Sequence, residues 1–335
     1  MAGFASFAIR VATRVIRSVP PLSLSIPRCA DRSAAILIAG PTASGKSALA
    51  TALARRYDGV VINTDSMQVY ADLRRLTARP DADDEHAVPH RLYGHVDGAL
   101  NYSAGHFARE VRDLLTRLDG CFPIFVGGTG LYFRALEEGL SEMPPVPEHV
   151  RRNIRTWAEP LKTQALHAEL VRLDPGGAAK LRPSDRARVL RALEIQIATG
   201  RPIADFQQTR TPGPLADFDL QKIFLAPDRD QLRKQIDLRF RRMIHAGALA
   251  EVETLRDRRL DPLLPIMRAH GVPGLIAHLE GTMTLEEAIV RGQADTRRYA
   301  KRQFTWFRHQ MGPGWQWLMP EAATAALGFS APDVR

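Results

Sequence analysis

An eight-residue loop, GPTASGKS, contains the residue types that proteins use to hold phosphate groups. It matches the pattern G-x-x-x-x-G-K-[ST] directly after the apolar segment AAILIA. Its glycines let backbone N–H groups point at phosphate oxygens, and the helix expected to follow adds the positive end of its dipole. Lys46 supplies a fixed charge, and the Ser47 hydroxyl supplies a ligand for Mg²⁺. The loop predicts a phosphate site without identifying the phosphate compound; its residues are Gly40, Pro41, Thr42, Ala43, Ser44, Gly45, Lys46 and Ser47.

Two other polar turns carry side chains with two interpretations each. In NTDSMQVY, Asp65 could act as a base or help to organise Mg²⁺, or Asp65 and Ser66 could simply cap a following helix. The same two interpretations apply to VGGTGLYF. Thr129 could serve the site or could only cap a helix, and the glycines could serve only close packing. Spacing alone leaves both pairs of interpretations open.

The segment RRYAKRQFTWFRHQ, residues 297–310, combines basic and aromatic residues at helical spacing. Such a face suits contact with an RNA backbone and stacking on its bases. The alternative is an ordinary amphipathic helix with core aromatics and solvated charges. The basic positions are Arg298, Lys301, Arg302 and Arg308, and the aromatic ones are Tyr299, Phe304, Trp306 and Phe307. His86, His90 and His95 do not share one helical face and have no cysteine beside them, so we expect no metal site there.

The elements that must position these residues read as alternating strands and helices. The apolar runs AAILIAG, GVVINTDS and FPIFVGGTG each end in a polar turn, and helix-like stretches follow, including a Gln- and Tyr-bearing segment after the second run. This order predicts a parallel α/β sheet with ligands at the carboxyl ends of its strands, and KIFLAP at 222–227 reads as a return to the sheet. After the Pro-rich PPVP, residues from about 148 to 200 read as helices only.

We therefore predict a P-loop NTPase-like α/β core with an inserted α-helical domain. The core is assigned to residues 34–140 and 206–320, the helical domain to residues 141–205, and a flexible tail to residues 321–335. The first 33 residues are set apart, since the first thirty contain four Arg and no acidic residue. They resemble either a transit peptide or a disordered extension, so we expect a cytoplasmic protein, or a mitochondrial one if they are a transit peptide.

Composition limits the class of partner. The net charge of +9 and the pI near 10 favour a polyanionic partner. No apolar run is long enough to cross a bilayer. The two cysteines, Cys29 and Cys121, show no metal-binding spacing and fit a reduced compartment.

Taken together, the motifs resemble one family, the tRNA dimethylallyltransferases. The resemblance covers roughly residues 35–318 and rests on eight segments in the family's order: GPTASGKS, NTDSMQVY, RPDADDEHAVPHRLYGHVD, VGGTGLYFRAL, RPSDRARVLRALEI, DLRFRRMI, MRAHGVPGLIAHLEG and RRYAKRQFTWFRHQ. It implies transfer of the dimethylallyl group of dimethylallyl diphosphate to N6 of the adenosine 3′-adjacent to the anticodon, in tRNAs reading codons that start with U. Diphosphate is released, the partner is the tRNA anticodon stem-loop, and the enzyme is a monomer.

The resemblance also assigns roles to residues. Asp65 matches the general base, and Thr129 matches a residue at the reacting centre. Lys46 and Arg239, with Mg²⁺ on Ser47, match the groups that neutralise the leaving diphosphate. Matches to tRNA contacts are Asp65, Ser66, Met67, Gln68, Thr129, Arg151, Ala187, Arg188, Val189, Leu190, Arg191, Arg268, Gly271, Arg298, Lys301, Arg302 and Gln303. Val272 and Pro273 depart from the family's aromatic and basic residues, which removes the side chains that would contact base or phosphate there.

Two other functions use the same loop. A small-molecule or nucleotide kinase would place ATP there, but it has no need of a basic helical insertion. A non-catalytic RNA-binding NTP switch would leave the DSMQ and VGGT turns without a role. The sequence therefore favours prenyl transfer to tRNA.

Overall fold

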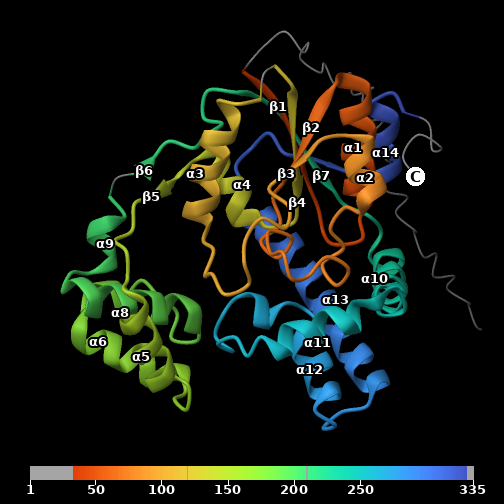
Figure 1. The fold of residues 1–335 in the computed structure, drawn as a ribbon. Helices are drawn as coiled ribbons and strands as arrows, with labels where there is room; N and C mark the ends of the chain where they lie inside the picture. The colour runs from red at the N-terminus through yellow and green to blue at the C-terminus, as the bar shows by residue number, and fades with distance from the viewer. Residues whose placement is uncertain (1–32, 119, 209, 330–335) are drawn as a thin grey trace, which may run out of the picture.

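The computed structural model describes residues 33–118, 120–208 and 210–329 (Figure 1). Their centre is a six-stranded parallel sheet in the order β3-β2-β4-β1-β7-β8. Its strands are β1 (Ala34–Ala39), β2 (Gly59–Asn63), β3 (His90–Arg91), β4 (Phe122–Gly127), β7 (Asp219–Leu225) and β8 (Gln316–Leu318), and a separate antiparallel pair is formed by β5 (Leu140–Ser141) and β6 (Arg210–Thr211). The predicted α/β class is confirmed.

Helices surround the sheet and build the rest of the described chain. They are α1 (Lys46–Tyr57), α2 (Ala82–Ala87), α3 (Ala104–Leu115), α4 (Gly130–Glu137), α5 (Glu148–Ala158), α6 (Thr163–Leu173), α7 (Pro175–Ala178), α8 (Arg186–Thr199), α9 (Ile203–Phe206), α10 (Arg229–Met243), α11 (Leu249–Asp257), α12 (Val272–Leu279), α13 (Leu285–Gln310) and α14 (Pro320–Ala326), with a π-helical turn η1 (Ile244–Ala248) and a 3₁₀ turn η2 (Ile266–Arg268). None of them is both long and apolar enough to span a bilayer.

Strands β1 and β4, at the centre of the sheet, are apolar throughout because both faces of the sheet are covered. All six residues of β1 are buried. Leu37 packs into the hydrophobic cluster shared with α3, α4 and α13, whereas its neighbours Ile36 and Ile38 pack on the other face with α1 and α14. This alternation follows from the two-residue period of a strand.

Two expectations differ from the structure. The segment after β2 is not a helix: residues 64–79 form turns, tied to residue 96 by an isolated bridge from Tyr70. The tail predicted from residue 321 begins as helix α14, whose Ala323 is fully buried against the sheet, together with Leu327 just after it. Residues 1–32 and 330–335, which hold most of the predicted extension and the end of the predicted tail, lie outside the described residues.

The helices between β5 and β6 form a unit with its own core. Helices α5 to α9 lie to one side of the sheet (green in Figure 1). Leu166 and Leu170 of α6 pack against Val189 and Leu193 of α8 in a hydrophobic cluster separate from those of the sheet. The β5–β6 pair joins this unit to the core at both of its connections.

Candidate active site

The glycine-rich loop connects β1 to α1 at the carboxyl end of the sheet. Gly45 has a φ of +84°, which favours glycine, and a Cβ at Gly40 would lie 2.8 Å from the Ser44 Oγ. The Lys46 ammonium folds back and donates a hydrogen bond to the Pro41 carbonyl at 3.0 Å. The buried Ser44 hydroxyl has no hydrogen-bond partner among the described residues, so the loop keeps donor groups available for a ligand.

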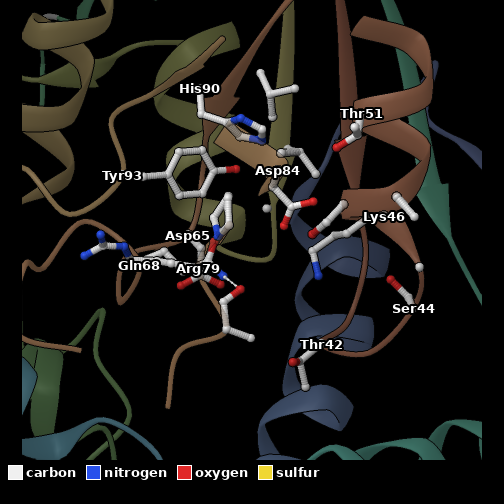
Figure 2. Close-up of a pocket in the computed structure, with 18 of the residues that line it drawn as sticks. Thr42, Ser44, Lys46, Thr51, Asp65, Gln68, Arg79, Asp84, His90 and Tyr93 are labelled. Atoms are coloured by element: carbon white, nitrogen blue, oxygen red, sulfur yellow. Dashed lines mark hydrogen bonds between the residues drawn. The ribbon is translucent and has the colours of Figure 1, made fainter. Parts of the chain in front are cut away.

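A polar cavity of about 410 Å³ opens beside this loop (Figure 2). Figure 2 shows the side chains of Lys46, Asp65 and Asp84 at this cavity, and Arg239 of α10 also lines it. Ser47, which is exposed, lines the same cavity as the Asp65 and Asp84 carboxylates, and oxygen donors of this kind are the ligands that Mg²⁺ prefers.

Lys46 and Arg239 bring two positive charges to this cavity without a neutralising ion pair. The pKa of Lys46 is lowered from 10.5 to about 8, first by burial and then by the charge of Arg239, while Asp65 opposes both effects. Burial likewise lowers the pKa of Arg239, again opposed by Asp65. Neither cation forms a salt bridge with a carboxylate of the described chain. The site is therefore short of negative charge, and an anion bound between the two cations would stabilise both.

Asp65 is held in place by backbone contacts. Its N–H donates to Asn63 Oδ1 at 2.8 Å, and the Asn63 amide donates to its carbonyl at 3.0 Å. The carboxylate accepts from the Met67 N–H at 2.9 Å through Oδ1, and Oδ2 has no partner among the described residues. Since no helix begins here, the helix-cap interpretation of Asp65 and Ser66 is wrong.

Thr129 links the turn after β4 to the turn after β2. Its hydroxyl accepts a hydrogen bond from the Ser66 N–H at 2.9 Å and donates to the Ser66 Oγ at 3.2 Å. It precedes α4, but its side chain makes no capping bond to that helix. Thr129 is therefore the N-cap residue of α4, as the helix-cap interpretation expects, but its hydroxyl bonds Ser66 beside Asp65 instead of the helix.

The glycines of VGGTG allow α13 to approach the sheet. A Cβ at Gly128 would lie 2.0 Å from the Gln303 Nε2, and one at Gly130 would lie 2.0 Å from the Trp306 ring. Gln303 donates to the Gly128 carbonyl at 2.8 Å and accepts from the Thr42 N–H at 3.3 Å. Gln303 thus joins the phosphate loop to the VGGTG turn, a role that the sequence did not indicate.

The wall opposite the loop comes from a segment to which the sequence assigned no site residue. Arg79, Asp84, His90 and Tyr93 line the polar cavity, as Figure 2 shows. Gln68 donates to the carbonyls of Thr77 and Ala78, both at 2.9 Å, and so fixes the turn before Arg79. The one signal for this wall was the segment RPDADDEHAVPHRLYGHVD, where polar residues cluster between two strands.

The histidines considered as metal ligands serve separate contacts. His86 bonds the Ala82 carbonyl, His90 bonds the Val88 carbonyl, and His95 pairs with Glu110 at 2.7 Å. The described residues contain no group of three or more His, Cys, Asp or Glu side chains that could hold a metal.

Part of the predicted tRNA-contacting set gathers around one buried carboxylate. Glu194 of α8, 2 % exposed, accepts from Arg155 at 2.9 Å and also pairs with Arg191 at 3.5 Å and Arg151 at 3.9 Å. Burial lowers the pKa of Arg268 and the nearby charge of Arg155 lowers it further, so Arg268 of the core lies near this cluster. Ala187 and Arg188 are exposed at the start of α8, and Leu190 is half-buried. Arg151 also pairs with Glu148 at 3.1 Å, so three cations share two carboxylates, and Arg268 adds a further cation that keeps this surface positive.

The structure corrects other members of the set. Val189, Gly271 and Gln303 are buried, so they pack inside the protein and offer no side-chain surface to RNA. Val272 is buried as well, and Pro273 is exposed. The residues of α13 do not form one face: Tyr299, with the Arg302 guanidinium over its ring, lies toward Asp65, whereas Arg298 and Lys301 line a groove against α10.

Comparisons with known proteins agree with each other. The sequence model described as IPP transferase matches residues 68–310, and the one described as isopentenyl transferase matches residues 33–102. The chain is 72% identical over 293 residues to a tRNA dimethylallyltransferase of Methylobacterium radiotolerans, covering 88% of this chain and 95% of that one. It is 65% identical over 306 residues to the protein of that description from Methylorubrum populi, covering 90% and 96%.

Solved structures of two enzymes that act on tRNA also align with this chain. The full-length tRNA isopentenylpyrophosphate transferase of Bacillus halodurans aligns with a TM-score of 0.62 at 32% identity, over 90% of this chain and 97% of that one. A eukaryotic dimethylallyltransferase acting on tRNA aligns with a TM-score of 0.70 at 29% identity, over 86% and 74%.

Proposed function

The chain belongs to the IPP transferase family of tRNA-prenylating enzymes, and from this premise we propose how its own residues carry out the transfer. The donor is dimethylallyl diphosphate, and the acceptor is N6 of the adenosine on the 3′ side of the anticodon, in tRNAs that read codons starting with U. The C–O bond between the allylic carbon and diphosphate breaks, a C–N bond to N6 forms, and the N6 proton is removed.

The observation that carries this proposal is the unpaired charge in the polar cavity. Lys46 and Arg239 face an anion site with no carboxylate of their own, beside the N–H groups of the loop and the N-terminus of α1. α1 has no acidic residue in its first turn to compete with an anion. A departing diphosphate gains negative charge, so these groups stabilise the transition state more than the bound donor.

Asp65 is the proposed general base. Its backbone is fixed through Asn63, one carboxylate oxygen is held by the Met67 N–H, and the other has no partner among the described residues. The exocyclic amine of adenine is a weak nucleophile, so a carboxylate that takes its proton as the C–N bond forms lowers the barrier. Thr129 and Ser66 hold the two turns beside Asp65 together and place the base against the donor.

Mg²⁺ is the proposed metal. The Ser47 hydroxyl would hold it together with diphosphate oxygens, because Mg²⁺ takes one or two protein oxygens beside substrate phosphates. Bound there, it would supply positive charge to the leaving group.

The target adenosine is stacked in the anticodon loop and must be extruded to reach Asp65. We propose that the anticodon stem-loop lies against the cluster of Arg151, Arg155 and Arg191 on one side and Arg268 on the other. These side chains supply phosphate contacts, whereas the identity of the base is read beside Asp65. We further propose that the enzyme works as a cytoplasmic monomer.

The test incubates the protein with a synthetic anticodon stem-loop, labelled dimethylallyl diphosphate and Mg²⁺, without ATP. We expect label on the stem-loop with adenosine at the target position and none on a matched stem-loop with guanosine, which lacks the N6 amine. A parallel reaction contains γ-labelled ATP instead of the labelled donor, and label transfer in that reaction alone would contradict prenyl transfer and support a kinase.

A further inference from the structure

A second, smaller cavity lies against the polar one and differs from it in chemistry. It measures about 80 Å³, and its walls include Met67, Leu76, Ile236, Phe240, Met243 and Ala269. Asp65, Arg239 and Thr42 line both cavities. A molecule that spans this shared wall would have an anionic end among the cations and an apolar end among these side chains.

Phe240 closes the apolar cavity as a fixed wall. It is 3 % exposed and follows Arg239 on α10. A Cβ at Gly292 would lie 2.2 Å from the Phe240 Cζ, and a Cβ at Gly271 would lie 2.9 Å from the same atom. Gly292 is inside α13, where glycine is unfavourable relative to alanine, and Gly271 has a φ of +98°. The two glycines leave the ring a slot that a larger residue at either position would fill.

We propose that this apolar cavity receives the branched five-carbon tail of the donor, and that Phe240 sets the chain length the enzyme accepts. This inference rests on the proposed function and adds to it the feature that selects the donor. With diphosphate at Lys46 and Arg239, the allylic carbon lies at the shared wall beside Asp65, and the tail continues toward Phe240.

The size of the cavity limits how far a chain can extend beyond its first isoprenyl unit. An apolar cavity of about 150 Å³ is known to hold benzene, and this one is about half as large and open at the shared wall. It has room for a short branched chain, whereas a second isoprenyl unit would meet the Phe240 ring. The ring lies close against Gly271 and Gly292, so it cannot move toward α12 or α13 without displacing them.

The end of the cavity at Phe240 favours a tail over the target base. Adenine carries ring nitrogens and an amine that need hydrogen-bond partners when buried. The apolar walls around Phe240, with Leu76 and Met243 beside it, carry no side-chain nitrogen or oxygen that could pair with them. The other half of the lining is polar and consists of Thr42, Asp65, Thr77, Arg239, His270, Thr296 and Tyr299, so only the end at Phe240 is assigned to the tail.

The experiment compares dimethylallyl and geranyl diphosphate as donors to the unmodified anticodon stem-loop. Wild type, Phe240→Leu and Met243→Ala are measured, with Phe107→Leu as a matched control. Phe107 is a fully buried phenylalanine of the same hydrophobic cluster that stacks on Tyr132 outside the cavity. Circular dichroism establishes that each variant is folded. Because Met243 is only half-buried, Met243→Ala enlarges the same cavity with a smaller loss of stability than Phe240→Leu.

We expect the ratio of kcat/KM for geranyl over dimethylallyl diphosphate to rise at least tenfold in Phe240→Leu and Met243→Ala, and to stay at the wild-type value in Phe107→Leu. A ratio unchanged in both folded cavity variants would overturn the inference, as would an equal rise in the control. If the variants instead raise KM for the stem-loop at an unchanged donor ratio, the cavity holds the base and the inference is wrong. The same assay also measures transfer from dimethylallyl diphosphate by the wild-type protein, which the proposed function predicts. If this transfer occurs but the donor ratio does not change in the variants, only the inference about Phe240 fails.

Discussion

The side-chain amide of Gln303 and the carbonyl of Gly128 meet in a buried hydrogen bond of 2.8 Å. The other atom of that amide accepts from the Thr42 N–H, so one residue of α13 connects the phosphate loop to the turn that carries Thr129. Residues 175 positions apart are thereby fixed beside the phosphate loop. This bond explains why α13 must lie close to the sheet and why the turn after β4 is rich in glycine.

Replacing Gln303 by Ala should therefore lower stability and activity together. The Gly128 carbonyl is buried and would lose its partner, which typically costs about 1–3 kcal/mol. Urea unfolding measures the free-energy change, and pyrophosphate affinity measures the effect on the loop. Gln235→Ala, on an exposed position of α10, is the control and should leave both values near wild type.

The proposed role of Asp65 as general base predicts that a variant can lose the transfer reaction and keep its affinity for the stem-loop. Asp65→Asn keeps the size of the side chain and an oxygen for the Met67 N–H, but it cannot take the proton. We expect kcat to fall by about 10²- to 10⁴-fold, with stem-loop affinity within a few-fold of wild type. Single-turnover kinetics and a filter-binding assay measure the two quantities. Asp230→Asn, an exposed position on α10, is the matched control, and full turnover in Asp65→Asn would show that another group accepts the proton.

The hydrogen bond of the Thr129 hydroxyl predicts that a substitution that keeps the hydroxyl retains activity and one that removes it does not. Thr129→Val keeps the shape of the side chain and removes the acceptor for the Ser66 N–H, so the DSMQ turn loses its link to the turn after β4. We expect kcat to fall by about tenfold or more, because loss of positioning at the reacting centre raises the barrier. Thr129→Ser restores the hydroxyl and should recover most of the rate. Equal loss in both variants would assign the effect to the methyl group instead.

Much of the site followed from local sequence, since strand, loop and helix occur in order around Lys46 and a polar turn follows the next strand at Asp65. The rest depends on contacts between distant segments. Helical periodicity marks the basic positions of α13 but cannot say which stripe faces Asp65 and which faces α10. The wall formed by Arg79 is set by the hydrogen bonds of Gln68, which no local pattern reveals.

The arginines of the inserted helices predict that the affinity for RNA falls as the salt concentration rises. Arg188 is exposed at the start of α8, and its ion pair with Asp185, at 3.4 Å, is a weak surface contact. If it binds a phosphate, Arg188→Ala should weaken stem-loop binding and reduce the slope of log K against log salt by about one. Arg172→Ala is the matched control, because Arg172 is equally exposed in the same unit and also pairs with a carboxylate three residues away. Identical slopes in the two variants would remove Arg188 from the interface.

The pKa of Lys46 predicts how stability and binding depend on pH. It is lowered from 10.5 to about 8 in the folded protein, first by burial and then by Arg239. Between pH 8 and 10.5 the unfolded chain binds more protons than the folded protein, so the free energy of unfolding rises with pH in this range. Below about pH 8 Lys46 is charged in both states, and the folded protein is destabilised by the full free energy of burying that charge. Lys46→Met removes that cost. The variant should be more stable than wild type at pH 7, and the difference should shrink between pH 8 and 10.5.

A bound diphosphate should reverse this shift, because its charge favours the protonated amine. Pyrophosphate binding by wild type at pH 9 should then take up a proton and weaken as the pH rises further, whereas Lys46→Met should bind weakly at every pH without that uptake. Calorimetry in two buffers of different ionisation enthalpy measures the proton directly. Proton uptake of the same size in Lys46→Met would place the titrating group elsewhere, whereas its loss would identify the Lys46 ammonium as the charge that holds the leaving group.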